Sequence, residues 1–133
     1  MLLKKIIVLC FLLPLVAVAA KPIKTTELEI PLPTPTPKEY ISLYAKKYNA
    51  VEKQLLAVAS CESRFNPKAV GDGGSARNIF QYHKGTFERF SDLLGEELDY
   101  NSYHDQAKLT AFIFAKYPKL KTHWTCWSML YGV

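Results

Sequence analysis

A glutamate continues the apolar face of a predicted helix. Val51, Leu55, Val58 and Glu62 are spaced i, i+4, i+7 and i+11, so Glu62 shares the face that should contact the core. A glutamate is seldom buried without a partner, and desolvation raises the pKa of its carboxyl group until it can hold and donate a proton near neutral pH. Glu62 is therefore a candidate general acid. The alternatives are a salt-bridged glutamate at a helix end, or a helix rotated so that Glu62 meets water.

Histidines and cysteines are the other side chains that could do chemistry: His83, His104, His123, Cys61 and Cys126. His123 and Cys126 have the spacing of a zinc-ligand pair, and Cys61 could be a nucleophile activated by a distant histidine. One such pair is not a motif, and both interpretations need free thiols, which an exported protein loses by oxidation. We therefore expect neither a metal nor a cofactor.

The first 20 residues have the composition of a secretory signal peptide. Lys4 and Lys5 precede an apolar run over residues 6–20, which ends in the small residues of Ala17-Val18-Ala19-Ala20. This run is short for a membrane span, which needs about 20 residues. The sequence therefore predicts a signal peptide at residues 1–20 and export to the periplasm, the cell wall or the medium. A retained segment that anchors the chain in the membrane is the alternative.

Export changes the number of cysteines that remain. Cys10 lies within the predicted signal peptide, which leaves Cys61 and Cys126 of the three cysteines. An even pair in an oxidising compartment indicates a disulfide. A bridge that closes about 65 residues would stabilise the fold by roughly 4 kcal/mol in the chain-entropy model, which matters in a domain with one small core.

The charge of the chain is mildly basic. Without Lys4 and Lys5, the 17 basic residues become 15, against 12 acidic ones, which gives a net charge of +3. This balance suits an anionic wall polymer. No dense basic stripe with interleaved aromatic residues is present, so we expect no nucleic-acid partner.

A proline-rich segment follows the predicted signal peptide. Residues 21–35 contain four prolines, and Pro-Leu-Pro-Thr-Pro-Thr-Pro begins at Pro31. Such a sequence is typical of an extended polyproline II spacer. The sequence predicts a linker at residues 21–35 and a folded domain at residues 36–133. An inert tail left by processing is the alternative to a spacer that lets the domain reach outward.

Capping residues mark the first two helices of this domain. The N-cap Thr36, with Pro37 and Glu39 after it, predicts the start of a first helix. A second helix is predicted to begin after Asn49 as its cap and to run to Ser63. An Asn-Pro pair shortly after this residue forbids further helix.

After a glycine-rich loop at residues 71–75, two further helices are predicted. Thr86 is expected to cap a third helix that Gly95 ends. Ser102 is expected to cap a helix over residues 103–116, which is apolar on nearly all sides, as a central helix would be. The sequence thus predicts a small, mostly α domain of about five to six helices with a Gly-rich cleft loop.

Two blocks of sequence resemble a known family. The first block is Leu-Leu-Ala-Val-Ala at residues 55–59, followed by Glu-Ser, Phe-Asn-Pro and Ala-Val up to residue 70. The second block is Ser-Ala-Arg-Asn-Ile-Phe-Gln-Tyr at residues 75–82, with Thr-Phe after it. Over residues 40–127 the chain is similar to the lysozyme-like domain of soluble lytic transglycosylases. The resemblance implies a lysozyme-like fold, glycan strands of peptidoglycan as the partner, and a monomer without a cofactor.

The resemblance also implies a reaction and its residues. Glu62 would protonate the glycosidic oxygen between N-acetylmuramic acid and N-acetylglucosamine, and would then take the proton of the muramic C6 hydroxyl group as a 1,6-anhydro ring closes. Ser63 would orient or cap near this carboxyl group and would contact the substrate. Gln81, with two donors and an acceptor, would contact an acetamido sugar, with Tyr82 beside it in the substrate site.

The chain departs from the family pattern at three points. Asn78 stands where the family prefers glycine, and Ile79-Phe80 replace Leu-Met. Asparagine tolerates a positive φ better than most residues, so we expect the turn to survive. The family's downstream Ala-Tyr-Asn-x-Gly block is missing. Tyr103 and Trp124 are candidates by position alone for its sugar-stacking tyrosine, and the aromatic character of each favours a place in the core.

Two other functions remain open. Hydrolysis by a lysozyme normally needs a second carboxylate, for which Asp72 is the candidate, although an aspartate in a glycine loop can also serve the turn itself. A wall-binding or assembly protein that keeps the groove but has lost turnover is the second alternative. Asn78 and the missing tyrosine block favour that alternative.

Overall fold

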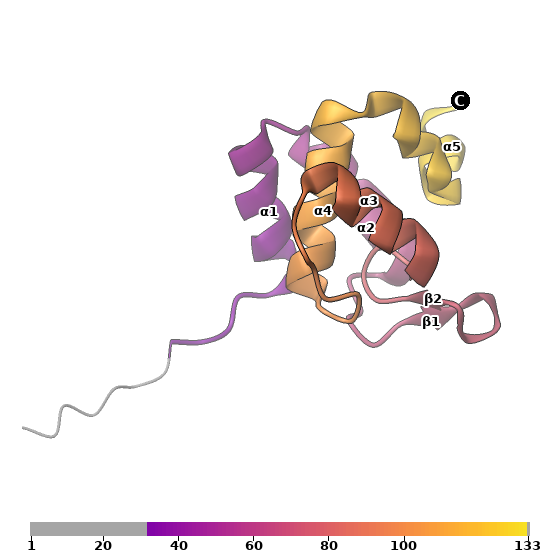
Figure 1. Cartoon of the computed structure of the whole chain (residues 1–133), viewed down its shortest axis with the longest axis horizontal. Coiled ribbons are helices and arrows are strands. Elements are labelled where there is room, and N and C mark those ends of the chain that lie inside the picture. The colour runs from indigo at the N-terminus through magenta and orange to yellow at the C-terminus, as the bar shows by residue number, and fades with distance from the viewer. Residues whose placement is uncertain (1–31, 133) are drawn as a thin grey trace, which may run out of the picture. The chain divides into compact units, whose positions relative to one another are not determined.

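The computed structural model describes residues 32–132, which form a mostly helical domain around one central helix (Figure 1). Its elements, in chain order, are α1 (Pro37–Tyr48), α2 (Glu52–Ser63), β1 (Val70–Gly71), the 3-10 turn η1 (Asp72–Gly74), β2 (Ala76–Arg77), β3 (Tyr82–His83), α3 (Lys84–Leu94), α4 (Tyr103–Lys116), the 3-10 segment η2 (Pro118–His123) and α5 (Thr125–Tyr131). The predicted fold class is confirmed. The predicted signal peptide and most of the predicted linker lie outside the described residues.

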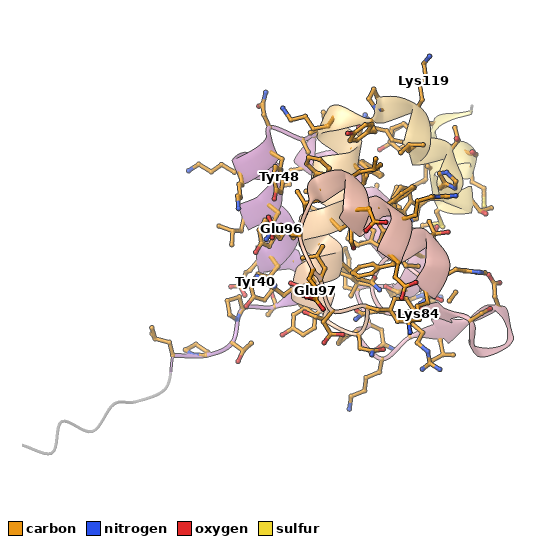
Figure 2. The ribbon with its side chains drawn as sticks, viewed as in Figure 1. Tyr40, Tyr48, Lys84, Glu96, Glu97 and Lys119 are labelled. Atoms are coloured by element: carbon orange, nitrogen blue, oxygen red, sulfur yellow. A yellow bond between two sulfur atoms is a disulfide. The ribbon has the colours of Figure 1, made fainter. Side chains whose placement is uncertain are left out.

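Helix α4 is the centre of the domain. Seven of its residues are buried: Gln106, Ala107, Leu109, Thr110, Ala111, Ile113 and Phe114. Tyr40 and Tyr48 extend from α1 towards α4 (Figure 2), where their rings pack edge-on against Tyr103 at 5.7 Å and Phe112 at 5.6 Å. The expectation that the apolar helix over 103–116 is central is therefore confirmed, because it has neighbours on nearly every side.

Three of the predicted helix ends are confirmed. Thr36 and Glu39 form a reciprocal capping box, in which each backbone N–H donates to the other residue's side chain, at 2.6 and 3.3 Å. The Ser102 hydroxyl accepts from the backbone N–H of Asp105 at the start of α4. Gly95 ends α3 in the left-handed conformation, at φ 73°.

Two predicted helix starts are wrong. Asn49 is the left-handed C-cap of α1, at φ 58°, and α2 begins later, behind Val51 as an N-cap without a side-chain bond. Val51 consequently lies outside the helix and is 56 % exposed, so the predicted apolar face starts at Leu55. Helix α3 begins at Lys84, before the expected cap Thr86. Asparagine suits both an N-cap and a left-handed C-cap, and its residue type alone does not distinguish them.

The glycine-rich segment joins two strands of a small sheet. Strands β1, β2 and β3 pair antiparallel in that order, with Val70 opposite Arg77 and Arg77 opposite Tyr82. The 3-10 turn η1 closes the β1–β2 hairpin (Figure 1). The two family-like blocks of sequence therefore lie next to each other through this sheet.

None of the helices at residues 32–132 has the length and apolar character that crossing a membrane requires.

Candidate active site

A pocket of about 320 Å³ lies where the end of α2, the small sheet and the start of α5 meet. Its walls are mainly polar, and the residues that line it are Glu62, Asp72, Ala76, Gln81, Tyr82, His83, Thr86, His123, Trp124 and Thr125. Four of the six residues predicted to act in catalysis or substrate binding are thus brought together from three separate parts of the chain: Glu62, Gln81, Tyr82 and Trp124.

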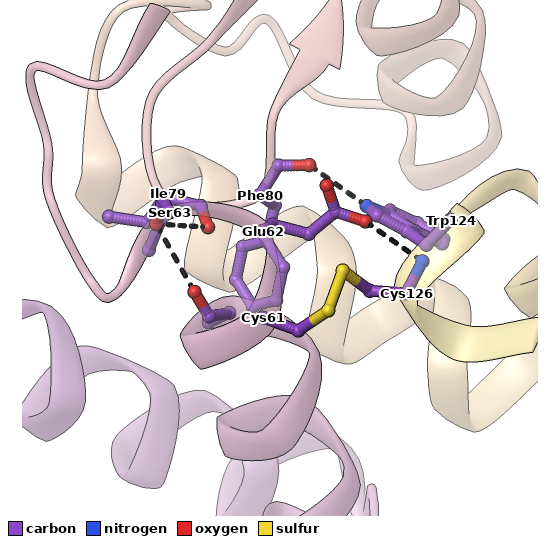
Figure 3. Close-up of a disulfide and its surroundings, with 8 residues drawn as sticks. Cys61, Glu62, Ser63, Ile79, Phe80, Trp124 and Cys126 are labelled. Atoms are coloured by element: carbon purple, nitrogen blue, oxygen red, sulfur yellow. Dashed lines mark hydrogen bonds between the residues drawn. A yellow bond between two sulfur atoms is a disulfide. The ribbon is translucent and has the colours of Figure 1, made fainter. Parts of the chain in front are cut away.

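Glu62 is half-buried in the last turn of α2. Its Oε1 accepts a hydrogen bond from the backbone N–H of Cys126, at 3.4 Å (Figure 3). Burial raises the pKa of the Glu62 carboxyl group above its ordinary value, the Cys126 N–H lowers it, and the negative charge of Asp72 raises it further. Because burial is the largest of these causes, the pKa is raised overall, as expected from the sequence.

Ser63 holds the second sequence block against the end of α2. Its hydroxyl group donates to the carbonyl oxygen of Ile79 at 2.8 Å and lies 3.2 Å from that of Ala59 (Figure 3). Ser63 does not line the pocket. Its contacts therefore position the loop, whereas the sequence analysis expected it to orient or cap Glu62 and to contact substrate.

The loop between β2 and β3 turns through two left-handed residues. Asn78 has φ 69° and Gln81 has φ 49°, so the prediction that Asn78 adopts a positive φ is confirmed. The Asn78 side chain accepts from the N–H of Ile79 at 2.7 Å and donates to the carbonyl oxygen of Asn101 at 2.8 Å. The side chain thereby supplies bonds that a glycine at this position would lack.

Gln81 uses its amide nitrogen within the protein. Its Nε2 donates to the carbonyl oxygens of Asn78, at 2.7 Å, and Ala69, at 3.2 Å. Both N–H groups of the amide are therefore occupied by backbone. Its Oε1 is the polar atom that remains for a ligand in the pocket. The sequence had suggested that both donors and the acceptor would be free to contact a sugar.

The three aromatic candidates have structural contacts. Tyr82 is buried, its hydroxyl group lies 3.0 Å from that of Thr110, and burial raises its pKa far above the ordinary value. Trp124 is 4 % exposed and donates from Nε1 to the carbonyl oxygen of Phe80 at 3.0 Å. Tyr103 lies outside the pocket, and its hydroxyl group donates to the carbonyl oxygen of Pro35. Trp124 and Tyr82 form walls of the pocket, and Tyr103 is not placed to stack on a sugar there.

An aspartate and two histidines complete the polar lining. Asp72 Oδ2 lies 2.7 Å from Nε2 of His83, and both side chains are more than half exposed. His123 packs edge-on against Phe90, with ring centroids 5.2 Å apart. From the sequence, Asp72 was considered as a second carboxylate, and the histidines as zinc ligands or as activators of a Cys61 nucleophile. The position of His83, two residues after Gln81, was the signal that could have placed it here.

A buried glutamine that was not predicted from the sequence supports the pocket loop from α4. Gln106 in α4 is fully buried; its Oε1 accepts from the N–H of Phe80, and its Nε2 donates to the carbonyl oxygens of Arg77 and Tyr100, each at 3.1 Å. An amide side chain on the buried face of a central helix was the available signal. Its three partners lie 6 to 29 residues away in sequence.

The predicted disulfide is confirmed. Cys61 and Cys126 are bonded, with Cα atoms 5.9 Å apart, and they connect α2 to α5 (Figure 3). Bonded sulfurs can neither ligate zinc nor attack as a thiolate. The zinc pair with His123 and the Cys61 nucleophile are therefore both ruled out for the oxidised protein.

Comparison with protein families agrees with the sequence resemblance. The family model described as the transglycosylase SLT domain matches residues 39–108, a region that contains Glu62, Gln81 and Gln106. The comparisons with curated proteins and with solved structures gave no match. Because the family model covers more than half of the 133 residues, the chain belongs to the transglycosylase SLT domain family.

Proposed function

We propose that this protein is an exported lytic transglycosylase that cleaves the β-1,4 bond between N-acetylmuramic acid and N-acetylglucosamine in peptidoglycan, with Glu62 as its general acid and base. Membership of the family gives the coarser assignment, a peptidoglycan-directed function of the lytic transglycosylase type. The proposal adds the bond that is cleaved, the product and the residue responsible. It also includes a signal peptide at residues 1–20, a linker at residues 21–35 and a catalytic domain at residues 36–133.

The state of Glu62 in the pocket is the observation that carries the proposal. The carboxyl group is half-buried, it faces a polar pocket, and burial raises its pKa. A raised pKa keeps a larger fraction of the acid protonated at the pH of the cell exterior, which is what proton donation to a leaving group requires. Asp72, the other carboxylate in the lining, is exposed and is paired with His83.

The proposed reaction needs one carboxyl group. Glu62 donates its proton to the glycosidic oxygen, and the bond from that oxygen to C1 of the muramic residue breaks. The C6 hydroxyl oxygen then bonds to C1, and its proton returns to the Glu62 carboxylate. The products are a free sugar hydroxyl group and a 1,6-anhydro end, and the enzyme is restored to its starting state without water being consumed. Hydrolysis would instead use a second carboxylate to activate water or to form a covalent intermediate.

Substrate contacts follow from the groups left free in the pocket. Oε1 of Gln81 can accept a hydrogen bond from the N–H of an acetamido group, since the Gln81 nitrogen is already bonded to backbone. Thr86 and Thr125 offer further polar contacts at the lining. Tyr82 and Trp124 give the pocket its apolar walls. The proposed partner is therefore a glycan strand, bound by one copy of the chain.

The products of wall digestion test the proposal. The exported protein is incubated with purified peptidoglycan, and the masses of the released fragments are measured. We expect fragments that end in anhydromuramic acid, lighter by one water than fragments with a reducing end. Activity should fall as the pH rises through the pKa of Glu62, because only the protonated acid can donate, and the midpoint should lie above the ordinary glutamate value.

Two substitutions separate the proposal from its alternatives. Glu62→Gln should abolish cleavage while wall binding and the fold persist, because glutamine keeps the volume of the side chain. Asp72→Asn should leave most of the activity. Reducing-end fragments, together with loss of activity in Asp72→Asn, would indicate a two-carboxylate lysozyme. This alternative is tested because Glu62 and Asp72 line the same pocket. Wall binding without any product from the unmodified protein would indicate an inactive wall-binding protein.

A further inference from the structure

We propose that the Cys61–Cys126 disulfide is a positioning device for the catalytic carboxyl group: it holds the backbone N–H of Cys126 on Glu62, so that turnover depends on the oxidised state of the bridge. This inference rests on the proposed role of Glu62. It extends that role by assigning a function to Cys126, which lies beyond the residues that the family model matches.

The bridge connects the residue before Glu62 to the residue whose N–H bonds to the Glu62 carboxyl group. Cys61 directly precedes Glu62 in the last turn of α2, and Cys126 is the second residue of α5. The two cysteines are 65 residues apart in sequence. In Figure 3 the bridge and the hydrogen bond from Cys126 to Glu62 lie side by side. The covalent link therefore holds the start of α5 directly against the end of α2.

The N–H of Cys126 is available to Glu62 for a local reason. The first N–H groups of a helix have no acceptor within the helix, and no side chain of the described residues caps α5. Within residues 32–132, this N–H is the one hydrogen-bond donor to the Glu62 carboxyl group. The direction of the carboxyl group is thus fixed by a contact that requires the first turn of α5 to stay in place.

The rest of this pocket wall has its own anchor. Trp124 donates to the carbonyl oxygen of Phe80, and its ring packs edge-on against Tyr82 at 5.2 Å and Phe114 at 5.3 Å. Loss of the bridge should therefore leave Trp124 in place and Glu62 covered, while the first turn of α5 loses its covalent link to α2 and keeps the packing of Trp127 on Phe114. The carboxylate then loses the donor that favours its charged form, so its pKa should rise further.

The bridge is open to reagents from one side. Cys61 is exposed, whereas Cys126 is 8 % exposed. A small dithiol such as dithiothreitol can supply two electrons, forming a mixed disulfide and then its own cyclic disulfide, and leaving two protein thiols. Removal of the dithiol and air oxidation reverse the change. The same protein can thus be studied with and without the bridge.

Kinetics of the oxidised, reduced and reoxidised protein test the inference, alongside the double variant Cys61→Ala/Cys126→Ala. On isolated glycan strands, loss of the bridge should lower kcat by about tenfold, because the proton donor is no longer held in place, and should leave KM within about twofold. The alkaline midpoint of the pH profile should move up by several tenths of a pH unit to about one unit. Reoxidation should restore the original profile, and dithiothreitol should not affect the double variant.

A control variant and the choice of assay temperature separate positioning from general loss of stability. Ile41→Ala removes a fully buried side chain of α1 that does not line the pocket, so it should lower the unfolding temperature without moving the pH profile. All assays are run well below the unfolding midpoints. An equal shift of the profile in Ile41→Ala, or an unchanged profile in the double variant, would overturn the inference.

A measurement that needs no turnover keeps this inference separate from the proposed function. Carbon NMR of the Glu62 carboxyl group gives its pKa directly in the oxidised and the reduced protein. A higher pKa after reduction supports the positioning role even if no lytic product is ever found, in which case the proposed function alone would fail. An unchanged or lower pKa after reduction would refute the positioning role.

Discussion

Replacing Gln106 by methionine removes the buried amide that supports the pocket loop while leaving the volume of the side chain nearly unchanged. Gln106 is fully buried and bonds to the N–H of Phe80 and to the carbonyl oxygens of Arg77 and Tyr100. The loop that it holds carries Gln81 into the pocket. We therefore expect Gln106→Met to destabilise the fold and to impair catalysis, although Gln106 does not line the pocket.

The loss of unfolding free energy in Gln106→Met follows from the backbone groups that are left without hydrogen-bond partners. The Phe80 N–H belongs to a fully buried residue, and an unsatisfied buried donor costs about 1–3 kcal/mol. The carbonyl oxygens of Arg77 and Tyr100 belong to residues that are partly or largely exposed, so each should cost about 0.5–1.5 kcal/mol. Together these give a loss of about 4 kcal/mol, a large share of the roughly 5–15 kcal/mol that a domain has.

Urea unfolding followed by tryptophan fluorescence measures this loss. The matched control is Leu109→Met in the same helix, where a fully buried apolar side chain is exchanged for another of similar volume, which should cost less than about 1.5 kcal/mol. Activity is compared at a temperature where both variants are folded, and Gln106→Met should be the slower. An unfolding free energy for Gln106→Met within about 1 kcal/mol of the control would refute the argument from unsatisfied groups.

Two further substitutions test the pocket walls. Trp124→Phe should lower the unfolding free energy by about 2–3 kcal/mol, because the carbonyl oxygen of Phe80 loses its buried donor and the smaller ring leaves a gap; a loss below about 0.5 kcal/mol in urea unfolding would contradict this. Gly71→Ala would place a methyl carbon 2.5 Å from Oε1 of Gln81, so it should displace that amide and lower kcat/KM by about tenfold. Gly85→Ala, with nothing within 4 Å of the new carbon, is the control and should keep full activity.

Most of the features that were predicted correctly from the sequence depend on contacts between residues close together in the chain. The caps at Thr36, Ser102 and Gly95 depend on contacts over three or four residues, and such local rules can be read directly from residue type. The left-handed turn at Asn78 is of the same kind. The disulfide between Cys61 and Cys126 followed from counting the cysteines of an exported chain.

Contacts between distant residues decided the rest. The donor to Glu62 is a backbone N–H 64 residues away, and every backbone N–H looks alike in a sequence. Gln81 gives its two N–H donors to backbone carbonyl oxygens. Of the three hydrogen-bonding groups of its side chain, only the acceptor Oε1 is therefore left for a ligand. Residue type alone showed Trp124 as a possible sugar contact, but the packing of α5 on the core makes it a buried wall. The sequence by itself thus determined the mostly helical fold class, the bridge and the presence of an acid at the end of α2, whereas the tertiary structure decided where α2 and α3 begin, which groups hold that acid and which remain free for a ligand. The physical reason is that burial and hydrogen-bond partners arise only when segments far apart in the chain are packed together.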